Sequence, residues 1–257
     1  MTVPPVARPF ARRATLKRSF ALLGDFRYEQ SAPEIFYGAL ARDSVELVGD
    51  LYAGLTGATL DGTTVLDVGG GPGYFADAFG AAGARYVPVE PDPTEMHAAG
   101  RAPGDSIRGS GMELPIRTSS VDVCFSSNVA EHVPRPWDMG EEMLRVTKPG
   151  GLTVVSYTVW LGPFGGHETG LWQHYVGGEY AARRYRRVHG HEPKNRFGRS
   201  LFPVGAADGL RWARSTASGE LVAAFPRYHP RWAWWMVRVP VLREFLVSNL
   251  VLVFRKV

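Results

Sequence analysis

The chain has 257 residues, 45% of them hydrophobic and 21% charged, with a formal net charge of +4 at pH 7. This length suits one α/β domain with insertions, and it can bury a sizeable core. One cysteine, Cys124, excludes a disulfide framework and is expected to be a small buried side chain. No apolar run approaches the roughly 18 residues of a membrane span.

The N-terminal region combines basic and apolar residues. Its apolar run at residues 20–23 is too short for the core of a secretory signal, so we expect a cytoplasmic protein. Residues 12–23 have the pattern of one basic amphipathic helix, which either packs on the domain or covers a substrate cleft or an anionic surface. Residues 32–55 predict a longer helix with one buried face.

A buried strand followed by a glycine-rich loop stands at residues 64–75. Apolar residues predict the strand, and the glycines let the backbone turn and approach a ligand before a helix begins. Such a unit is the first βα turn of a doubly wound sheet, where a nucleotide-like ligand binds near the helix N-terminus. The dinucleotide fingerprint would need a glycine at position 74, where this chain has Tyr74, and no Lys-containing phosphate loop is present.

An acidic residue ends the next predicted strand, at residues 85–90. Glu90 comes 17 positions after Gly73, near the spacing expected for a carboxylate that accepts hydrogen bonds from ribose hydroxyls. Each such charge-assisted bond contributes roughly 1.5–3 kcal/mol. Glu90 therefore indicates an adenosine-containing ligand, and a solvated acid at a strand end is the structural alternative.

Further motifs follow at the spacing of successive βα units. They are L-P at residues 114–115, S-V-D-V at 120–123, E-H-V at 131–133 and K-P-G-G at 148–151. With D-V-G-G-G-P-G at residues 67–73, they resemble the type-11 branch of class I methyltransferases that use S-adenosylmethionine (SAM). The resemblance covers about residues 60–156.

This resemblance implies an α/β fold with a doubly wound, Rossmann-like sheet of seven mostly parallel strands. N-terminal helices would precede the sheet, and an insertion would follow its fifth strand. The whole chain, 1–257, would be one domain with a helical cap (1–58), a SAM-binding core (59–156) and a substrate-side part (157–257). SAM would be the cofactor and S-adenosylhomocysteine the product.

The resemblance also implies the residues of the cofactor crevice. They are Asp67, Gly69, Gly70, Gly71, Gly73, Glu90, Pro91, Ser110, Gly111, Met112, Glu113 and Asn128. One position departs from the family pattern, because Ser110 stands where an acid usually holds the adenine amino group. A hydroxyl accepts that bond more weakly, so adenine placement would depend more on the Met112 backbone and on apolar packing.

Histidines are the catalytic candidates, since a methyl acceptor often has to lose a proton. His132 follows the fourth predicted strand and faces the crevice in the resembled family. His167 lies in a glycine-rich segment, residues 160–170, that is suited to closing over a substrate. Both have structural alternatives, and Glu131, Glu168, Tyr157, His174 and His229 are further polar candidates. His189 and His191 lack a third ligand, so no metal site is predicted.

The charge of the chain divides near Gly151. Residues 1–150 hold 14 Lys and Arg against 19 Asp and Glu, whereas residues 151–257 hold 15 against 6. The basic part is the one that carries acceptor specificity in this architecture. It contains an insertion at about 160–203, a predicted helix with a basic face at 180–191, and predicted strands at 220–225 and 249–254.

A tryptophan-rich stretch with several arginines lies between these last strands. Trp232, Trp234 and Trp235 have three competing interpretations, namely core packing, contact with an acyl chain or membrane surface, and a homodimer face. Nucleic acid is not an expected partner, because no RNA-binding module accompanies these residues.

The whole chain is also similar to methyltransferases of mycolate-making actinobacteria that are associated with cell-envelope glycolipids. This similarity suggests an oxygen acceptor on a lipid, a glycolipid or a sugar. It also suggests peripheral contact with the anionic inner face of the membrane. A soluble enzyme for a small metabolite and a non-catalytic SAM-binding protein are the alternatives.

Overall fold

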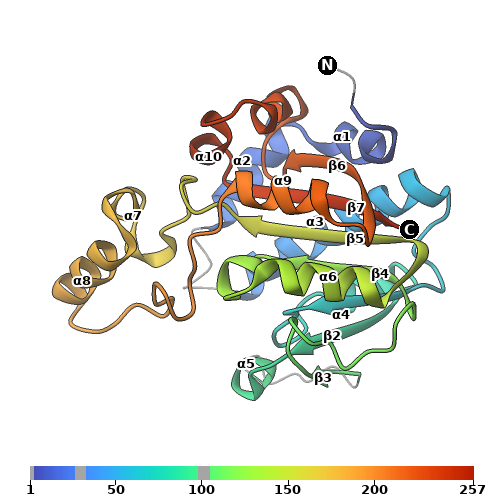
Figure 1. Cartoon of the computed structure of the whole chain (residues 1–257), viewed down its shortest axis with the longest axis horizontal. Coiled ribbons are helices and arrows are strands. Elements are labelled where there is room, and N and C mark those ends of the chain that lie inside the picture. Colours follow the sequence, from blue (N-terminus) through green and yellow to red (C-terminus); the bar gives the residue numbers. More distant parts are fainter. Residues whose placement is uncertain (1–2, 27–32, 98–104) are drawn as a thin grey trace.

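The computed structural model describes residues 3–26, 33–97 and 105–257. A seven-stranded sheet in the order β3-β2-β1-β4-β5-β7-β6 runs through the molecule (Figure 1). The strands are β1 Thr64–Val68, β2 Arg85–Glu90, β3 Ile107–Arg108, β4 Val121–Ser127, β5 Thr147–Thr158, β6 Gly219–Pro226 and β7 Asn249–Lys256. β7 pairs antiparallel with β5 and β6, and the remaining pairs are parallel. The predicted doubly wound, mostly parallel sheet is confirmed.

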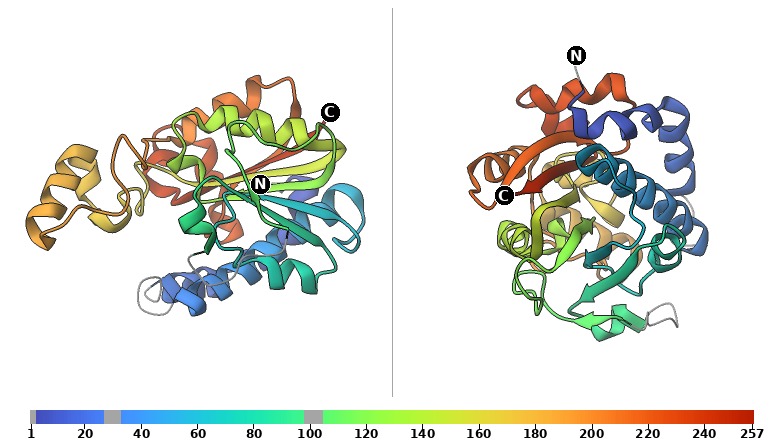
Figure 2. Two further views of the ribbon diagram at one scale, coloured as in Figure 1. Left: turned by 90° about the horizontal axis from the view of Figure 1, so that it is seen from below. Right: turned by 90° about the vertical axis from the view of Figure 1, so that its right-hand side faces the viewer.

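Helices cover both faces of this sheet (Figure 2). The α-helices are α1 Arg8–Arg13, α2 Leu16–Phe26, α3 Pro33–Thr56, α4 Ala76–Ala81, α5 Pro93–His97, α6 Pro136–Val146, α7 Gln173–Val176, α8 Gly178–His189, α9 Ala206–Ser215 and α10 Leu242–Leu246. The 3-10 helices are η1 Pro5–Ala7, η2 Ala130–His132, η3 His167–Thr169 and η4 Arg231–Arg238.

The core consists of two apolar layers, one on each face of the sheet. On one face, Phe10 of α1, Leu47 of α3 and Phe79 of α4 pack on the strands. On the other, Met143 of α6 and Leu210 of α9 do so. Each such buried side chain contributes about 1.5–3 kcal/mol through the hydrophobic effect. The central strands are buried on both faces, which explains why they are continuous apolar runs.

Cys124 lies in this core, fully buried within β4. Burial raises the pKa of its thiol well above the usual value, so the thiolate is not formed near neutral pH. The prediction of a small buried side chain is confirmed.

The predicted helix at residues 12–23 is wrong in one respect, because the chain breaks it at Ala14. The break frees the Ala14 carbonyl, which accepts a hydrogen bond of 2.8 Å from the Arg231 backbone N–H. Thr15 then precedes α2 and caps its N-terminus, with its hydroxyl accepting from the Arg18 N–H at 3.2 Å. The longer predicted helix is confirmed as α3, and its first predicted residue, position 32, lies outside the described residues.

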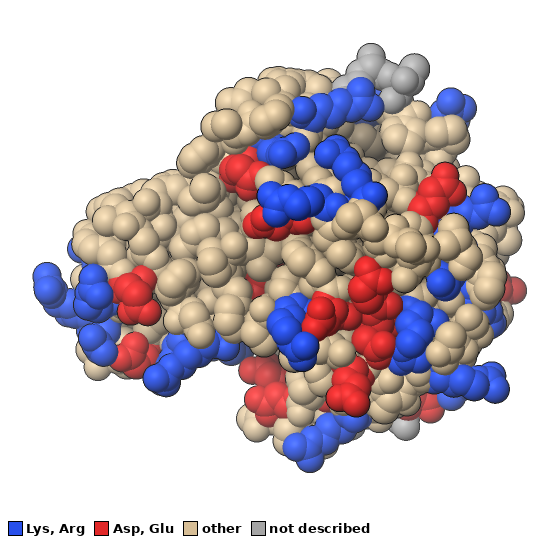
Figure 3. Space-filling view, viewed as in Figure 1, with Lys and Arg blue, Asp and Glu red and all other residues tan. Residues whose placement is uncertain are grey.

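The segment between β5 and α9 forms an arm. α7 and α8 project from the body on the side toward which the β5 arrow points (Figure 1). Lys and Arg side chains gather over the α8 end of this arm (Figure 3). The predicted helix with a basic face is confirmed as α8, and the last two predicted strands are confirmed as β6 and β7. Among the described residues, no helix combines the length and apolarity needed to cross a bilayer.

Candidate active site

The glycine loop begins where β1 ends, at the carboxyl edge of the sheet. Gly69, Gly71 and Gly73 have φ angles of +79°, +50° and +75°, which residues with a Cβ rarely adopt. Gly70 is constrained differently, since an added Cβ would lie 2.8 Å from the Cβ of Pro88. Backbone turning and close packing therefore explain why this loop needs glycine.

Asp67 lies beneath this loop. Its carboxyl group is 2% exposed and accepts a hydrogen bond of 2.5 Å from the Tyr86 hydroxyl. Burial raises the pKa of Asp67 to about 7, although the bond from Tyr86 opposes the shift. A Cβ on Gly70 would come within 3.1 Å of this carboxyl group, so the structure places Asp67 as a support for the loop.

Glu90 ends β2 beside the loop. One carboxylate oxygen accepts the Gly71 N–H at 3.3 Å, and the other accepts the Asp92 N–H at 3.2 Å. Partial burial raises its pKa above the usual value. A carboxylate has about four acceptor positions, so Glu90 can still receive hydroxyl donors from a ligand. Pro91, next to it, is exposed.

The predicted adenine segment packs against the end of β1. A Cβ on Gly111 would lie 2.9 Å from Cγ1 of Val68, which shows how closely the two segments approach. The Ser110 hydroxyl accepts the Met112 N–H at 3.2 Å, and the Ser110 carbonyl accepts the Glu113 N–H at 3.1 Å. The segment is therefore a tight turn, and the Glu113 side chain is exposed.

The N-terminal helices reach this edge through the start of α3. The rings of Tyr37 in α3 and Tyr74 in the glycine loop are stacked, with centroids 4.3 Å apart and planes 1° apart. Farther along, Leu47 and Leu51 of α3 cover a face of the sheet. The beginning of α3 therefore borders the crevice, while the rest of the helix is core.

Asn128 connects the glycine loop to the ends of β4 and β5. It has φ +56°, and its N–H donates to the Ser156 carbonyl at 2.7 Å. Its side-chain oxygen accepts from Asn249 at 2.8 Å and from the Thr158 hydroxyl at 3.4 Å. Its neighbour Val129 packs on Gly69. The loop and the next strand end thus form one continuous surface.

The two predicted catalytic histidines meet at this strand end. The ring centroids of His132 and His167 are 5.0 Å apart, and the two ring planes are nearly perpendicular. His132 is held through Nδ1 by the Ser200 carbonyl at 2.6 Å, and His167 through Nδ1 by the Gly165 carbonyl at 3.2 Å. Burial lowers the pKa of His167, and the nearby Glu131 partly opposes this shift. Both imidazoles keep Nε2 for other partners.

Three of the other polar candidates form hydrogen bonds within the fold. Glu168 accepts two bonds from Asn195, at 2.6 and 2.8 Å. The Tyr157 hydroxyl donates to the Gly205 carbonyl at 3.0 Å, and His174 contacts the Gly162 carbonyl at 3.1 Å. Burial lowers the pKa of His174 and also that of His229. His189 and His191 instead pack around Tyr185 at the end of α8.

Residues 66–155 match the family model described as a methyltransferase domain. An uncharacterized methyltransferase of Mycobacterium marinum is 68% identical over 248 residues, which are 95% of this chain and 96% of that protein. Another, of Mycobacteroides abscessus, is 64% identical and covers 98% of this chain and 99% of that protein. The chain belongs to the methyltransferase family. Its enzymatic activity is methyl transfer, and SAM is its cofactor.

The fold of this methyltransferase agrees with that of solved relatives. A geranyl diphosphate methyltransferase in complex with SAM superposes with a TM-score of 0.52 at 13% identity. The match covers 86% of this chain and 90% of that one. Identity at this level speaks for the fold, while the acceptor has to be argued from the site.

The methyltransferase has a buried cation that the sequence analysis missed. Arg227, at the end of β6, is 0% exposed and forms a salt bridge of 3.2 Å with Asp43 of α3. It also donates to the Ser127 hydroxyl at 2.6 Å, and Arg18 binds Asp43 from the other side. The only local sign was Asp43, an acid on the apolar face of a predicted helix.

The Trp-rich stretch of the methyltransferase divides between core and surface. Trp234 is 5% exposed and stacks on Phe225 with centroids 4.3 Å apart, which confirms core packing for this residue. Trp232 is 69% exposed and Trp235 is 42% exposed. The stretch forms η4 followed by α10.

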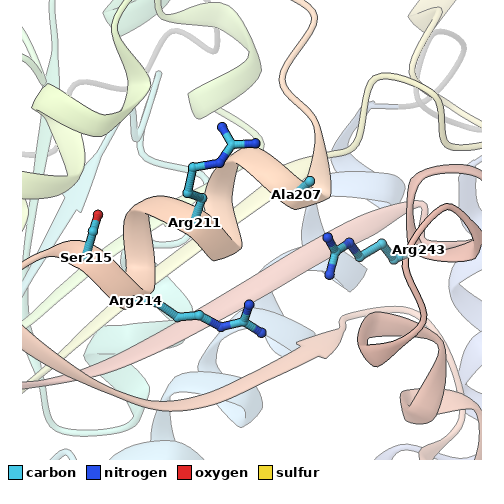
Figure 4. A pocket seen from close by; sticks show the side chains of 5 residues that line it. All are labelled: Ala207, Arg211, Arg214, Ser215 and Arg243. Atoms are coloured by element: carbon cyan, nitrogen blue, oxygen red, sulfur yellow. The ribbon is translucent and has the colours of Figure 1, made fainter.

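Two pockets are lined in part by residues of α9 and α10. One, of about 440 Å³, has apolar side chains from Trp160, Leu161 and Phe245 in its wall. The other, of about 300 Å³, is basic, and Figure 4 shows Arg243 of α10 reaching toward Arg211 and Arg214 of α9. Neither pocket is lined by the glycine loop. The methyltransferase therefore offers an apolar groove and a basic one outside its cofactor crevice.

Proposed function

We propose that this methyltransferase transfers the methyl group of SAM to an oxygen atom of a lipid, glycolipid or sugar acceptor. The donor would lie over the glycine loop, with Glu90 receiving the ribose hydroxyls and residues 110–113 beside the adenine. The acceptor would enter at the ends of β4 and β5. The observation that carries this proposal is the pair formed by His132 and His167 at that edge.

The reaction needs alignment and the removal of one proton. A lone pair of the acceptor oxygen forms the new bond to the methyl carbon while the C–S bond breaks and its electrons return to sulfur. Alignment alone supplies up to ~7–11 kcal/mol of the barrier, and proton removal adds roughly 10²–10⁴-fold in rate. We assign His132 and His167 to the acceptor hydroxyl, with Nε2 of one of them accepting its proton. The backbone carbonyl that holds each ring contacts Nδ1, so Nε2 is free for this role.

Apolar side chains exposed near the arm support a lipid acceptor. They are Leu171, Trp172, Tyr175 and Val176 around α7, and Val241, Leu242, Phe245 and Leu246 around α10. The ring centroids of Tyr175 and Phe245 are 6.2 Å apart, so the two groups of apolar side chains lie next to each other. Patches of this kind mark lipid or protein contacts. With the arginines of α8, they would let the protein lie on the anionic inner face of a membrane.

The test is methyl transfer from radiolabelled SAM to an actinobacterial envelope lipid extract and, separately, to its water-soluble metabolites. We expect label in the lipid fraction, lost in His167→Gln and retained in His191→Gln. Calorimetric titration with SAM confirms that both variants keep their cofactor site. Label confined to the soluble fraction would instead indicate a metabolite enzyme. Tight SAM binding without turnover on either fraction would indicate a non-catalytic protein.

A further inference from the structure

We propose that Glu131, His132 and His167 form a binding site for a divalent transition-metal cation. One carboxylate oxygen and two imidazole nitrogens lie within 4.8 Å of one another. Two histidines and one carboxylate are the donor set of many catalytic zinc sites and of non-haem iron(II) sites. The suggested role of the cation rests on the proposed function, since it would lie where the acceptor oxygen enters.

The two imidazoles are prepared to act as ligands. A backbone carbonyl only accepts hydrogen bonds, so the contacts of His132 with Ser200 and of His167 with Gly165 require the proton on Nδ1. The lone pair of a neutral imidazole then lies on Nε2. Metal-binding histidines are held in this way, with the second nitrogen donating to a carbonyl or carboxylate that fixes the tautomer and the ring orientation.

Glu131 gives an independent indication of a missing partner. Its side chain is 1% exposed, and Oε1 accepts the Thr158 N–H at 3.0 Å. The other oxygen, Oε2, is buried and has no hydrogen-bond partner among the described residues. A buried carboxylate oxygen without a partner is unfavourable and uncommon in native proteins. A cation between Glu131 and the two histidines would supply that partner.

The distances suit a cation once the three side chains move closer together. Nitrogen and oxygen ligands lie about 2.0–2.2 Å from zinc, so two of them in a tetrahedral site are about 3.3–3.6 Å apart. The three groups, which lie within 4.8 Å of one another, therefore need to close by up to about 1.2–1.5 Å. Side-chain rotation can provide this, because both histidine rings are only partly buried.

Three protein ligands would leave a coordination position for the acceptor hydroxyl. Binding to the cation lowers the pKa of such a hydroxyl, as it does for zinc-bound water. Its proton passes to solvent water, the oxygen lone pair attacks the methyl carbon, and the C–S electrons return to sulfur. The histidines would then act as ligands and the cation would activate the acceptor.

The experiment is calorimetric titration of the chelator-treated full chain with Zn²⁺, together with Co²⁺ absorption spectroscopy. We expect one Zn²⁺ per chain, and visible d–d bands of tetrahedral or five-coordinate intensity with Co²⁺. Glu131→Gln and His167→Ala should each weaken Zn²⁺ binding at least about tenfold. The control is His189→Ala combined with His191→Ala, which removes two exposed histidines outside the cluster and should leave Zn²⁺ binding unchanged.

The outcomes separate this proposal from the proposed function. Titration with S-adenosylhomocysteine shows whether each variant is folded, and the metal titration needs no acceptor. Absence of saturable Zn²⁺ and Co²⁺ binding by the wild-type chain would overturn the cation site. So would unchanged affinity in a folded Glu131→Gln chain. Lipid methylation that persists in the chelator-treated enzyme would leave the proposed function in place and remove the cation from it.

Discussion

The carboxyl edge of the sheet has two parts that are built in different ways. Around β1 and β2, the site is mainly backbone, with glycines at positive φ and one carboxylate, Glu90, accepting from that backbone. Around β4 and β5, it is mainly side chains, and Glu131, His167 and Arg227 come from separate parts of the chain. In the proposed function, the first part would bind SAM and the second would face the methyl acceptor.

This difference indicates where each part is vulnerable. A backbone loop tolerates little change at its glycines, yet it needs few long-range contacts. A side-chain cluster requires the whole fold to bring its members together, and its buried charges depend on one another. The following predictions test this division from the largest expected effect to the smallest.

The strongest test of the side-chain part is Arg227→Ala. Removing Arg227 breaks a buried ion pair and leaves Asp43 with Arg18 as its remaining cationic partner, so we expect the free energy of unfolding to fall by up to about 3–5 kcal/mol. Arg238→Ala, at an exposed position of the same region, should change it by less than about 0.5 kcal/mol. Urea unfolding measures both. Equal effects of the two variants would mean that the Arg227 network does not stabilise the fold.

The backbone part should show its own pH dependence through Asp67. Its folded pKa of about 7 lies above the usual 3.8, so the folded state binds the proton more tightly than the unfolded state. The contribution of Asp67 to the free energy of unfolding is therefore fully present below about pH 4. It is lost as the pH rises to 7, and the total loss is roughly 4 kcal/mol. Asp67→Asn should lack this component when unfolding is measured across that pH range. If the free energies of unfolding of wild type and Asp67→Asn change in parallel with pH, the assigned role of Asp67 is contradicted.

Glu90→Ala tests whether SAM binding by the backbone part depends on a single side chain. Losing two charge-assisted bonds to ribose hydroxyls should weaken SAM binding at least about 100-fold in calorimetric titration. Glu95→Ala, which changes a nearby carboxylate that pairs with Lys194, should keep affinity within about threefold of wild type. If Glu90→Ala binds SAM as tightly as wild type does, the ribose contact lies elsewhere.

The smallest expected effect concerns the exposed tryptophans. Trp232→Ala and Trp235→Ala should each weaken binding to anionic vesicles roughly three- to tenfold, and neutral vesicles should bind poorly in every case. Vesicle sedimentation measures this. A loss of dimer in analytical ultracentrifugation without a change in vesicle binding would instead identify a dimer face. Trp234 is unsuitable for this test because it is core.

The backbone part, around β1 and β2, could be predicted from the sequence because the residues that determine it are local. An apolar run, four glycines and an acid at a strand end define strand, loop and helix without reference to the rest of the chain. The strands β6 and β7 could also be predicted, because each is a local apolar run.

Only the tertiary structure decided the side-chain part, around β4 and β5. No local pattern shows that His167 lies beside His132, that Glu131 keeps an unpartnered buried oxygen, or that Arg227 is fully buried. Likewise, no local pattern shows that the helix breaks at Ala14, whose carbonyl accepts a hydrogen bond from the backbone N–H of Arg231, far away in the chain. Sequence periodicity reports which face of an element is buried, whereas these features depend on which distant segments pack against that face.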